Sequence, residues 1–513
     1  MSPAYAITAV VVVSLATLIV GVWGFRVART TSDFFVASRS VGASLNASAI
    51  GGEYLSAASF LGVAGLLLVS GADMLWYPVG WTGGYLVLMV LVAAPLRRSG
   101  AYTLPDFAEA RLQSRWVRLV CSLLVVTIGW LYLIPQFQGA NLVLGPFMGA
   151  RPWMAGVVVA GVVLANVLVG GMRSITLVQA FQYWLKLTAL LVPIIFLLIV
   201  WSHGGAPSPV DTPAIGGVDG PEWASPMTSS SEHPLYLTWS IIFATTLGTM
   251  GLPHVVVRFY TNPDGRAARR TTLAVLVLLA IFYVLPPIYG SLGRIYAPDL
   301  IASGRADAVV LELPLRMIGG VGGELLSALL LGGAFAAFLS TSSGLTVALA
   351  GVLSQDVISK RIHPIRAFRL AAIVAVVVPL LLSIGLRDVS LARTVGLAFA
   401  VAASTFCPLL LLGIWWRGLT DIGALAGLAV GGWTSLIAVV NSMIGGKQTG
   451  WAADLLGQPA LWTVPLAFAT MVVISLLTKS RIHPSVNRFM VRLHTPESLR
   501  VDRGPASNSG RLT

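Results

Sequence analysis

Long apolar runs dominate this sequence and constrain its fold more than any other feature. Hydrophobic residues make up 56% of the 513 positions and charged residues only 10%, against about 25% in a typical soluble domain. Charged or Gly/Pro-rich breaks separate the runs, which lie near residues 4–25, 43–70, 76–96, 119–145, 152–170, 175–200, 236–257, 272–293, 325–355, 370–386, 394–414, 422–444 and 460–478. Because each run approaches or exceeds the ~20 residues of a helical span, we predict an all-α polytopic membrane protein with about 13 transmembrane helices. The runs are too long and too uniformly apolar for the strands of a β-barrel.

The distribution of basic residues predicts the orientation of the chain. Of the 33 Lys and Arg residues, 25 fall in alternate loops on one side and 7 on the other, while Lys186 lies inside a span. The positive-inside rule therefore places the richer side and the basic tail, residues 479–513, in the cytoplasm, with the N-terminus outside. The first run has no basic residue before it, so we interpret it as a retained span in the plasma membrane. The net charge of +13 thus reflects topology, and we expect no nucleic-acid partner.

Two spans are predicted to be broken within the membrane. Gly51, Gly52 and the acid Glu53 interrupt the second span, and Gly248, Gly251 and Pro253 interrupt the seventh. The two breaks are five spans apart, an odd number, so spans 2–6 and 7–11 would form two inverted repeats around a central transport site. The predicted organisation is an extra first span and loop (1–42), a first repeat (43–200), an outer loop (201–235), a second repeat (236–414), two further spans (415–478) and the tail (479–513).

Other polar residues inside the spans are weaker indicators. Glu53 is either functional, as intramembrane acids usually are, or a solvated gate residue. The hydroxyl cluster from Ser340 to Thr346 could offer oxygen ligands to an alkali cation, or could bond back to its own helix. We expect Lys186 to extend its ammonium towards the membrane surface. The sequence has no ATP-binding loop, metal motif or catalytic grouping, which favours a secondary transporter over an enzyme.

Five stretches resemble the sodium:solute symporter family, and most closely its cation/acetate or monocarboxylate branch. They are DFFVASRSVG (33–42), GGEYLSAASFLG (51–62), YTLPDFAEARL (102–112), GLPHVVVRFYTNPDGRAARR (251–270) and the run from Ser340 to Asp356. The resemblance covers roughly residues 30–480. It implies a leucine-transporter-like core of two inverted five-helix repeats, and a sodium ion held between spans 2 and 9. Carried over by motif, the sodium ligands would be the carbonyls of Gly52, Leu55 and Ala337 and the hydroxyls of Ser340 and Thr341.

The predicted function is sodium-coupled symport of a small monocarboxylate such as acetate, propionate or pyruvate, with no cofactor beyond Na⁺ as the coupling ion. Tyr54 stands where the family's proline symporters have an acid, which argues against proline. We expect the substrate shell to include Tyr54, Ser56, Gln138, Thr246 and His254. The partners are then a small organic anion and the lipid bilayer. The alternatives are proton coupling, with Glu53 as the proton-coupling or gate residue, sodium symport of another small organic solute, and a uniporter or channel.

Overall fold

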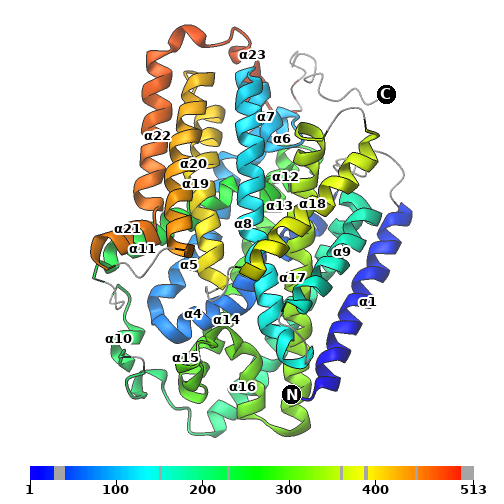
Figure 1. Cartoon of the computed structure of the whole chain (residues 1–513), viewed down its shortest axis with the longest axis vertical. Helices are drawn as coiled ribbons and strands as arrows, with labels where there is room; N and C mark the ends of the chain where they lie inside the picture. The colour runs from blue at the N-terminus through cyan, green and yellow to red at the C-terminus, as the bar shows by residue number, and fades with distance from the viewer. Residues whose placement is uncertain are drawn as a thin grey trace.

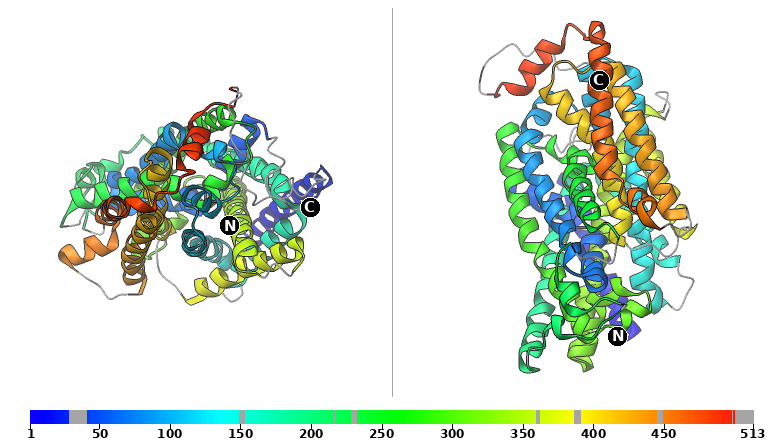
Figure 2. Two further views of the ribbon diagram at one scale, coloured as in Figure 1. Left: turned by 90° about the horizontal axis from the view of Figure 1, so that it is seen from above. Right: turned by 90° about the vertical axis from the view of Figure 1, so that its left-hand side faces the viewer.

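The computed structural model describes residues 1–27, 41–148, 153–215, 217–227, 232–358, 362–385, 391–444, 449–497 and 499. These residues form an elongated bundle of helices that run roughly along one long axis (Figures 1 and 2). Within them the structure contains no β-strand beyond one isolated bridge between Ile215 and Val218. The all-helical prediction is therefore confirmed.

The longer helices are α1 (Pro3–Val27), α3 (Ala43–Tyr54), α5 (Trp76–Leu91), α8 (Arg115–Met148), α9 (Met154–His203), α11 (Pro234–Gly251), α13 (Gly265–Tyr283), α14 (Leu285–Tyr296), α17 (Gly320–Asp356), α18 (Pro364–Gly385), α19 (Leu391–Trp415), α20 (Asp421–Ile444) and α22 (Ala460–Leu477). Shorter helices connect or extend them: η2 (Ala58–Gly62), α4 (Val63–Ser70), η3 (Gly71–Leu75), α6 (Ala93–Ser99), α7 (Leu104–Leu112), η4 (Pro209–Asp211), α10 (Gly220–Ala224), α12 (Pro253–Phe259), α15 (Asp299–Ala302), η5 (Ala306–Ala308), α16 (Val309–Met317), α21 (Gly450–Gly457), η6 (Lys479–Arg481) and α23 (Val486–His494).

Ten helical segments of the described chain are long and apolar enough to cross a membrane, or eleven if the bent pair α11 and α12 forms one span. The sequence predicted about thirteen runs, and the difference has two sources. The apolar segment Met154–Leu168 of α9 is shorter than a full span, and Ala58–Leu91 is one continuous helical segment that covers parts of two predicted runs. Within the described residues the apolar runs are thus helical apart from the breaks, but the structure divides them differently.

The first and last described helices mark opposite ends of the bundle. α1 begins at the end that also carries α10, α15 and α16, whereas α23 lies at the end that carries α6 and α7 (Figure 1). This separation agrees with an odd number of membrane crossings, such as the eleven counted when the bent pair is taken as one span. We call the second end the α7 end; the positive-inside rule predicts that it faces the cytoplasm.

The helices differ in how far they are enclosed by the rest of the bundle. In α17 and α19, 83% and 89% of the most apolar window is buried inside the protein, whereas in α1 only 22% is. α1 accordingly lies at the edge of the bundle, against α9 and α17 (Figure 1). α17 and α19 therefore form the interior of the bundle. A helix that is apolar all round but mostly exposed has lipid as its solvent, so α1 faces the membrane.

Both predicted breaks exist, but one lies elsewhere. α11 ends at Gly251 and α12 begins at Pro253, with a bend of 46° between them, as the sequence predicted. In the second span the helix continues through Gly51 and Gly52 and ends at Tyr54, so the break falls at Leu55 and Ser56. The break thus lies within the predicted stretch, residues 49–62, but after the two glycines, which do not interrupt the helix. They serve close packing, because a methyl group at either position would overlap with α9.

Arg118 holds three helices together at the α7 end. Its guanidinium forms ion pairs with Asp106 and Glu109 of α7 and with Asp356 at the end of α17, the first and third at 2.9 and 2.7 Å. Asp106 also belongs to a capping box with Thr103, which fixes the start of α7. Two of the stretches that carried the family resemblance therefore meet at this arginine.

We expect Arg118→Ala to lower the stability of the protein by ~1–2 kcal/mol, because three carboxylates lose a shared partner that is still partly exposed to water. Thermal unfolding in detergent measures the effect. The control is Arg115→Ala, one turn earlier on the exposed face of the same helix. Equal melting temperatures of the two variants would contradict a structural role for the cluster.

Candidate transport site

The two broken spans lie side by side in the interior. The Tyr54 hydroxyl, at the end of α3, is 2.8 Å from the Thr249 hydroxyl near the end of α11. Asn46 of α3 donates to the Arg258 carbonyl at the end of α12. At a break, the helix ends leave backbone N–H and C=O groups without helical partners, and proteins use such groups to bind cations and anions. The site is therefore built up from these two breaks.

A buried ion pair joins the first break to the second. The Arg258 Nε donates to a Glu53 carboxylate oxygen at 2.6 Å, with the two side chains 1% and 2% exposed. Arg258 also donates to the Thr176 hydroxyl at 2.9 Å and to the Gln179 side-chain oxygen. Gly344 of α17 makes room for the Glu53 carboxylate, since a methyl group there would overlap with it. Arg258 is one of the 25 basic residues that were assigned to loops on the richer side; that assignment was wrong, because it lies in the interior as the counter-charge of Glu53.

The five residues expected to bind sodium come together beside this pair. The carbonyls of Gly52 and Leu55 and the hydroxyl of Ser340 all accept hydrogen bonds from the Lys186 Nζ, the latter two at 2.7 and 2.9 Å. The Ser340 hydroxyl donates to the Ala337 carbonyl at 3.2 Å. The Thr341 hydroxyl donates to the Glu53 carbonyl at 2.6 Å. The expected oxygens thus converge, and a lysine contacts three of them.

Lys186 does not reach the membrane surface. Its side chain has 0% exposure, and its partners lie on α3 and α17, in the interior. The expectation that it snorkels was wrong, because three backbone and hydroxyl oxygens offer its ammonium a buried alternative to water.

The expected substrate residues separate into two groups. Tyr54, Ser56 and His254 are at most 1% exposed and lie at the two breaks. By contrast, the Thr246 hydroxyl donates to the Gly80 carbonyl, within the contact between α11 and α5. Gln138 lies two positions from Gln136 on α8, so the two side chains leave the helix in different directions. The neighbour Gln136 reaches the break instead, where its side-chain oxygen accepts from the Ala57 N–H at 3.3 Å.

An aromatic cluster surrounds the first break, and the sequence analysis did not name most of it. We use the term aromatic cluster for Tyr54, Trp81, Tyr85, Tyr132, Phe399 and His254, each at most 1% exposed. Their rings contact one another at centroid distances of 4.8 Å for Tyr54 and Tyr85, 5.8 Å for Trp81 and Phe399, and 5.1 Å for Tyr132 and His254. Phe399 of α19 touches Tyr54, Trp81 and Tyr132 and so joins the contacts together.

Several polar atoms of the aromatic cluster have no protein partner. Among the described residues, nothing accepts from the Trp81 Nε1 or bonds to the Tyr85 hydroxyl, and both ring nitrogens of His254 lack a hydrogen bond. Buried polar groups are normally satisfied, so such a concentration indicates a place that a ligand or water completes. A signal in the sequence was available, since tyrosine and tryptophan within apolar runs carry the polar ends that such a site needs.

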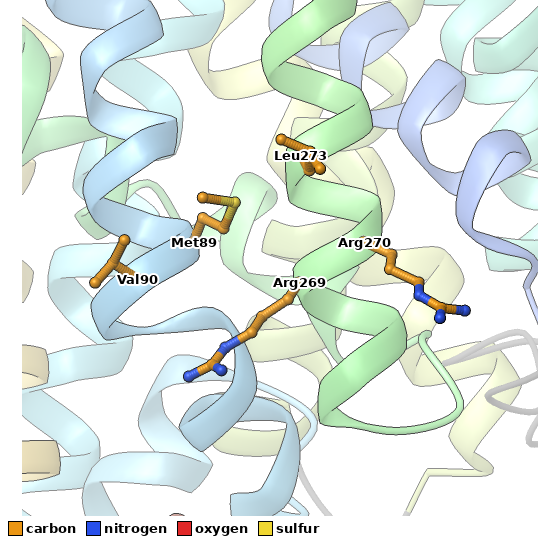
Figure 3. A pocket seen from close by; sticks show the side chains of 5 residues that line it. All are labelled: Met89, Val90, Arg269, Arg270 and Leu273. Atoms are coloured by element: carbon orange, nitrogen blue, oxygen red, sulfur yellow. The ribbon is translucent and has the colours of Figure 1, made fainter.

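A surface groove lies away from this site, between α5 and α13. It has a volume of about 350 Å³ and is lined by Met89, Val90, Arg269, Arg270 and Leu273. Figure 3 shows the Arg269 and Arg270 side chains pointing to opposite sides of α13, so the two do not converge on one anion. The groove therefore lacks the arrangement of a substrate site.

Comparisons with known proteins agree with the geometry. The sodium:solute symporter family model matches residues 34–431. An uncharacterized symporter of Bacillus subtilis, YwcA, is 30% identical over 470 residues, covering 88% of this chain and 90% of the relative. A monocarboxylic acid transporter of Corynebacterium glutamicum is 30% identical over 486 residues, 86% of each chain.

Solved structures show the same fold. A substrate-bound, outward-open Na⁺-coupled sialic acid symporter superposes with a TM-score of 0.67 at 16% identity, covering 91% of this chain and 98% of that one. The nucleobase-cation-symport-1 transporter Mhp1 matches with a TM-score of 0.54 at 14% identity, covering 90% and 99%. The fold is therefore leucine-transporter-like, as the sequence predicted. A family match over most of the chain, together with two broken helices that meet in the interior, identifies this protein as a member of the sodium:solute symporter family, a secondary transporter rather than an enzyme.

Proposed function

We propose that this chain carries a small monocarboxylate, such as acetate, propionate or pyruvate, by cation-coupled symport, and that its substrate binds at the first break against the aromatic cluster. The observation that carries the proposal is the set of buried, unpartnered polar groups on Trp81, Tyr85 and His254. The name of the relative from Corynebacterium glutamicum supports the substrate class.

The charges at the two breaks also suit one anion. Lys186 and Arg258 supply two basic groups and Glu53 one acid, so the ion pair leaves the lysine in excess. Ala57 begins the second half of the broken span, where the helix dipole favours negative charge. A single carboxylate would balance the excess charge, whereas an uncharged solute would leave it unbalanced in the interior.

Uptake of labelled acetate into proteoliposomes tests the proposal. One arm imposes an inward sodium gradient and the other an inward proton gradient without sodium, because both couplings are consistent with the family. We expect concentrative uptake in at least one arm, competed by propionate and pyruvate but not by proline. Equilibration without accumulation under both gradients would instead show a uniporter or channel, and failure of small carboxylates to compete would exclude the substrate class.

Tyr85→Phe is expected to raise the KM for the carboxylate by about 10-fold or more. The variant removes a hydroxyl that would donate to a charged group, and such a bond contributes ~1.5–3 kcal/mol. The matched control is Tyr289→Phe, which also removes one buried hydroxyl, but one outside the aromatic cluster that already donates to the Leu190 carbonyl. An unchanged KM in Tyr85→Phe, or the same rise in both variants, would place the substrate elsewhere.

A further inference from the structure

Lys186 is the most unusual charged residue of the interior. It lies in the middle of α9, where its side chain has 0% exposure and points to the junction of α3 and α17. Lysine is almost never fully buried unless it has a specific partner. The contacts of its Nζ atom therefore explain why it is tolerated there.

The three oxygen contacts of the Lys186 Nζ atom match the donors of an ammonium group. Nζ contacts three acceptors, namely the Gly52 carbonyl, the Leu55 carbonyl at 2.7 Å and the Ser340 hydroxyl at 2.9 Å. The Ser340 hydroxyl proton is directed at the Ala337 carbonyl, so Ser340 accepts from the lysine. Three acceptors need three N–H donors, which an ammonium has.

The same oxygens are those that the family resemblance assigns to a sodium ion. Gly52, Leu55 and Ser340 accept hydrogen bonds from Lys186, Ala337 accepts from Ser340, and Thr341 donates to the Glu53 carbonyl. A metal ion placed among them would have to share its ligands with an ammonium at hydrogen-bond distance. Two positive charges so close in a dry interior repel strongly.

The acid nearest this site already has a counter-charge. Glu53 is paired with Arg258 at 2.6 Å, and Gln179 ties that pair to the site by accepting from Arg258 and donating to the Ser340 carbonyl at 2.8 Å. Across the described part of the chain, Lys186 forms no ion pair of its own. Its ammonium makes its hydrogen bonds to carbonyl and hydroxyl oxygens, the ligand types that hold an alkali cation.

We propose that the Lys186 ammonium is a resident cation that replaces the coupling sodium ion of this site, so that the chain transports its substrate without binding sodium there. The ammonium holds the end of α3 against α17. A sodium ion bound among the same oxygens would stabilise this contact in the same way. The residues at the site thus do not fit a sodium ion as the sequence analysis expected, because the ligands are already occupied. The inference rests on the proposed function only where acetate transport is measured; the sodium-binding measurement on the purified protein does not depend on it.

The binding assay compares three forms of the full-length protein in detergent, by melting temperature in NaCl and in choline chloride at equal concentration. The wild type is expected to show no difference between the salts. Lys186→Ala removes the ammonium and leaves room for an ion among the same oxygens, so sodium should raise its melting temperature by ~2 °C or more. Lys186→Met fills the space with an uncharged chain and should not respond to sodium.

The transport assay uses the wild type in proteoliposomes with an inward proton gradient, in choline or sodium buffer. We expect equal acetate uptake in the two buffers. Sodium-dependent uptake or a sodium-dependent melting temperature in the wild type would overturn the inference while leaving monocarboxylate symport intact. The inference would also be overturned if sodium raised the melting temperature of Lys186→Ala no more than that of Lys186→Met. Absence of uptake under every gradient would refute the proposed function, and the melting data would still decide the role of Lys186.

Discussion

Arg258→Ala is expected to destabilise the protein by ~3–5 kcal/mol and to abolish transport. The substitution leaves the Glu53 carboxylate, 2% exposed, without its counter-charge in the interior. Removal of one partner from a buried ion pair has this large cost because the remaining charge can neither reach water nor find another partner. The two residues also join the first break to the second, so the loss should affect the site directly.

A double-mutant cycle measures this effect against its control. Glu53→Gln alone should also destabilise the protein, whereas the double variant Glu53→Gln with Arg258→Ala should cost less than the sum of the two single variants. The control is Arg316→Ala, which breaks the exposed pair with Asp299 at the opposite end and should cost at most ~1 kcal/mol. If melting temperatures fall equally in Arg258→Ala and Arg316→Ala, the buried pair does not stabilise the junction of the two breaks.

Gly52→Ala is expected to have the second large effect, a loss of ~3 kcal/mol of stability together with loss of transport. A methyl group at this position would overlap with the carbonyl oxygen of Gln179 on α9. Both groups belong to packed helices, so neither can move cheaply, and the cost should lie at the upper end of the overpacking range. The displaced α3 would also carry the Gly52 and Leu55 carbonyls away from Lys186.

The matched control for that change is Gly351→Ala in α17, where a methyl group meets nothing within 4 Å. In a helix interior this substitution should be neutral or stabilising by up to ~1 kcal/mol, because alanine favours the helix. Thermal unfolding and acetate uptake report on both variants. Comparable behaviour of the two alanine variants would show that α3 and α9 approach less closely than the structure indicates.

The sequence predicted the regular parts of this molecule well, for a physical reason. A chain in lipid must satisfy its backbone within each span, so apolar length by itself predicts helices. The bend at Gly251 and Pro253 was also predictable, because proline cannot continue the preceding helix. The break in the second span was placed a few residues too early, because Gly51 and Gly52 fit both a break and close packing, and only the position of α9 distinguishes the two.

The sequence could not predict which side chains pair with one another across the bundle. Arg258 and Glu53 are 205 positions apart, so neither pattern nor spacing could pair a basic residue at an expected loop with an acid in a span. Likewise, only the tertiary structure shows that the polar ends of Tyr85 and Trp81 lie together with the unpartnered ring nitrogens of His254.

The sequence by itself determined the all-helical membrane fold, the existence of two broken spans and the membership of the family, since hydropathy and local motifs carry that information. The tertiary structure decided what fills the centre. It placed Lys186, one lysine in a long apolar run, against the Gly52, Leu55 and Ser340 oxygens that the resemblance assigns to a sodium ion. The physical reason is that hydropathy and local motifs are properties of one segment, whereas contacts between α3, α9 and α17 depend on how the helices pack.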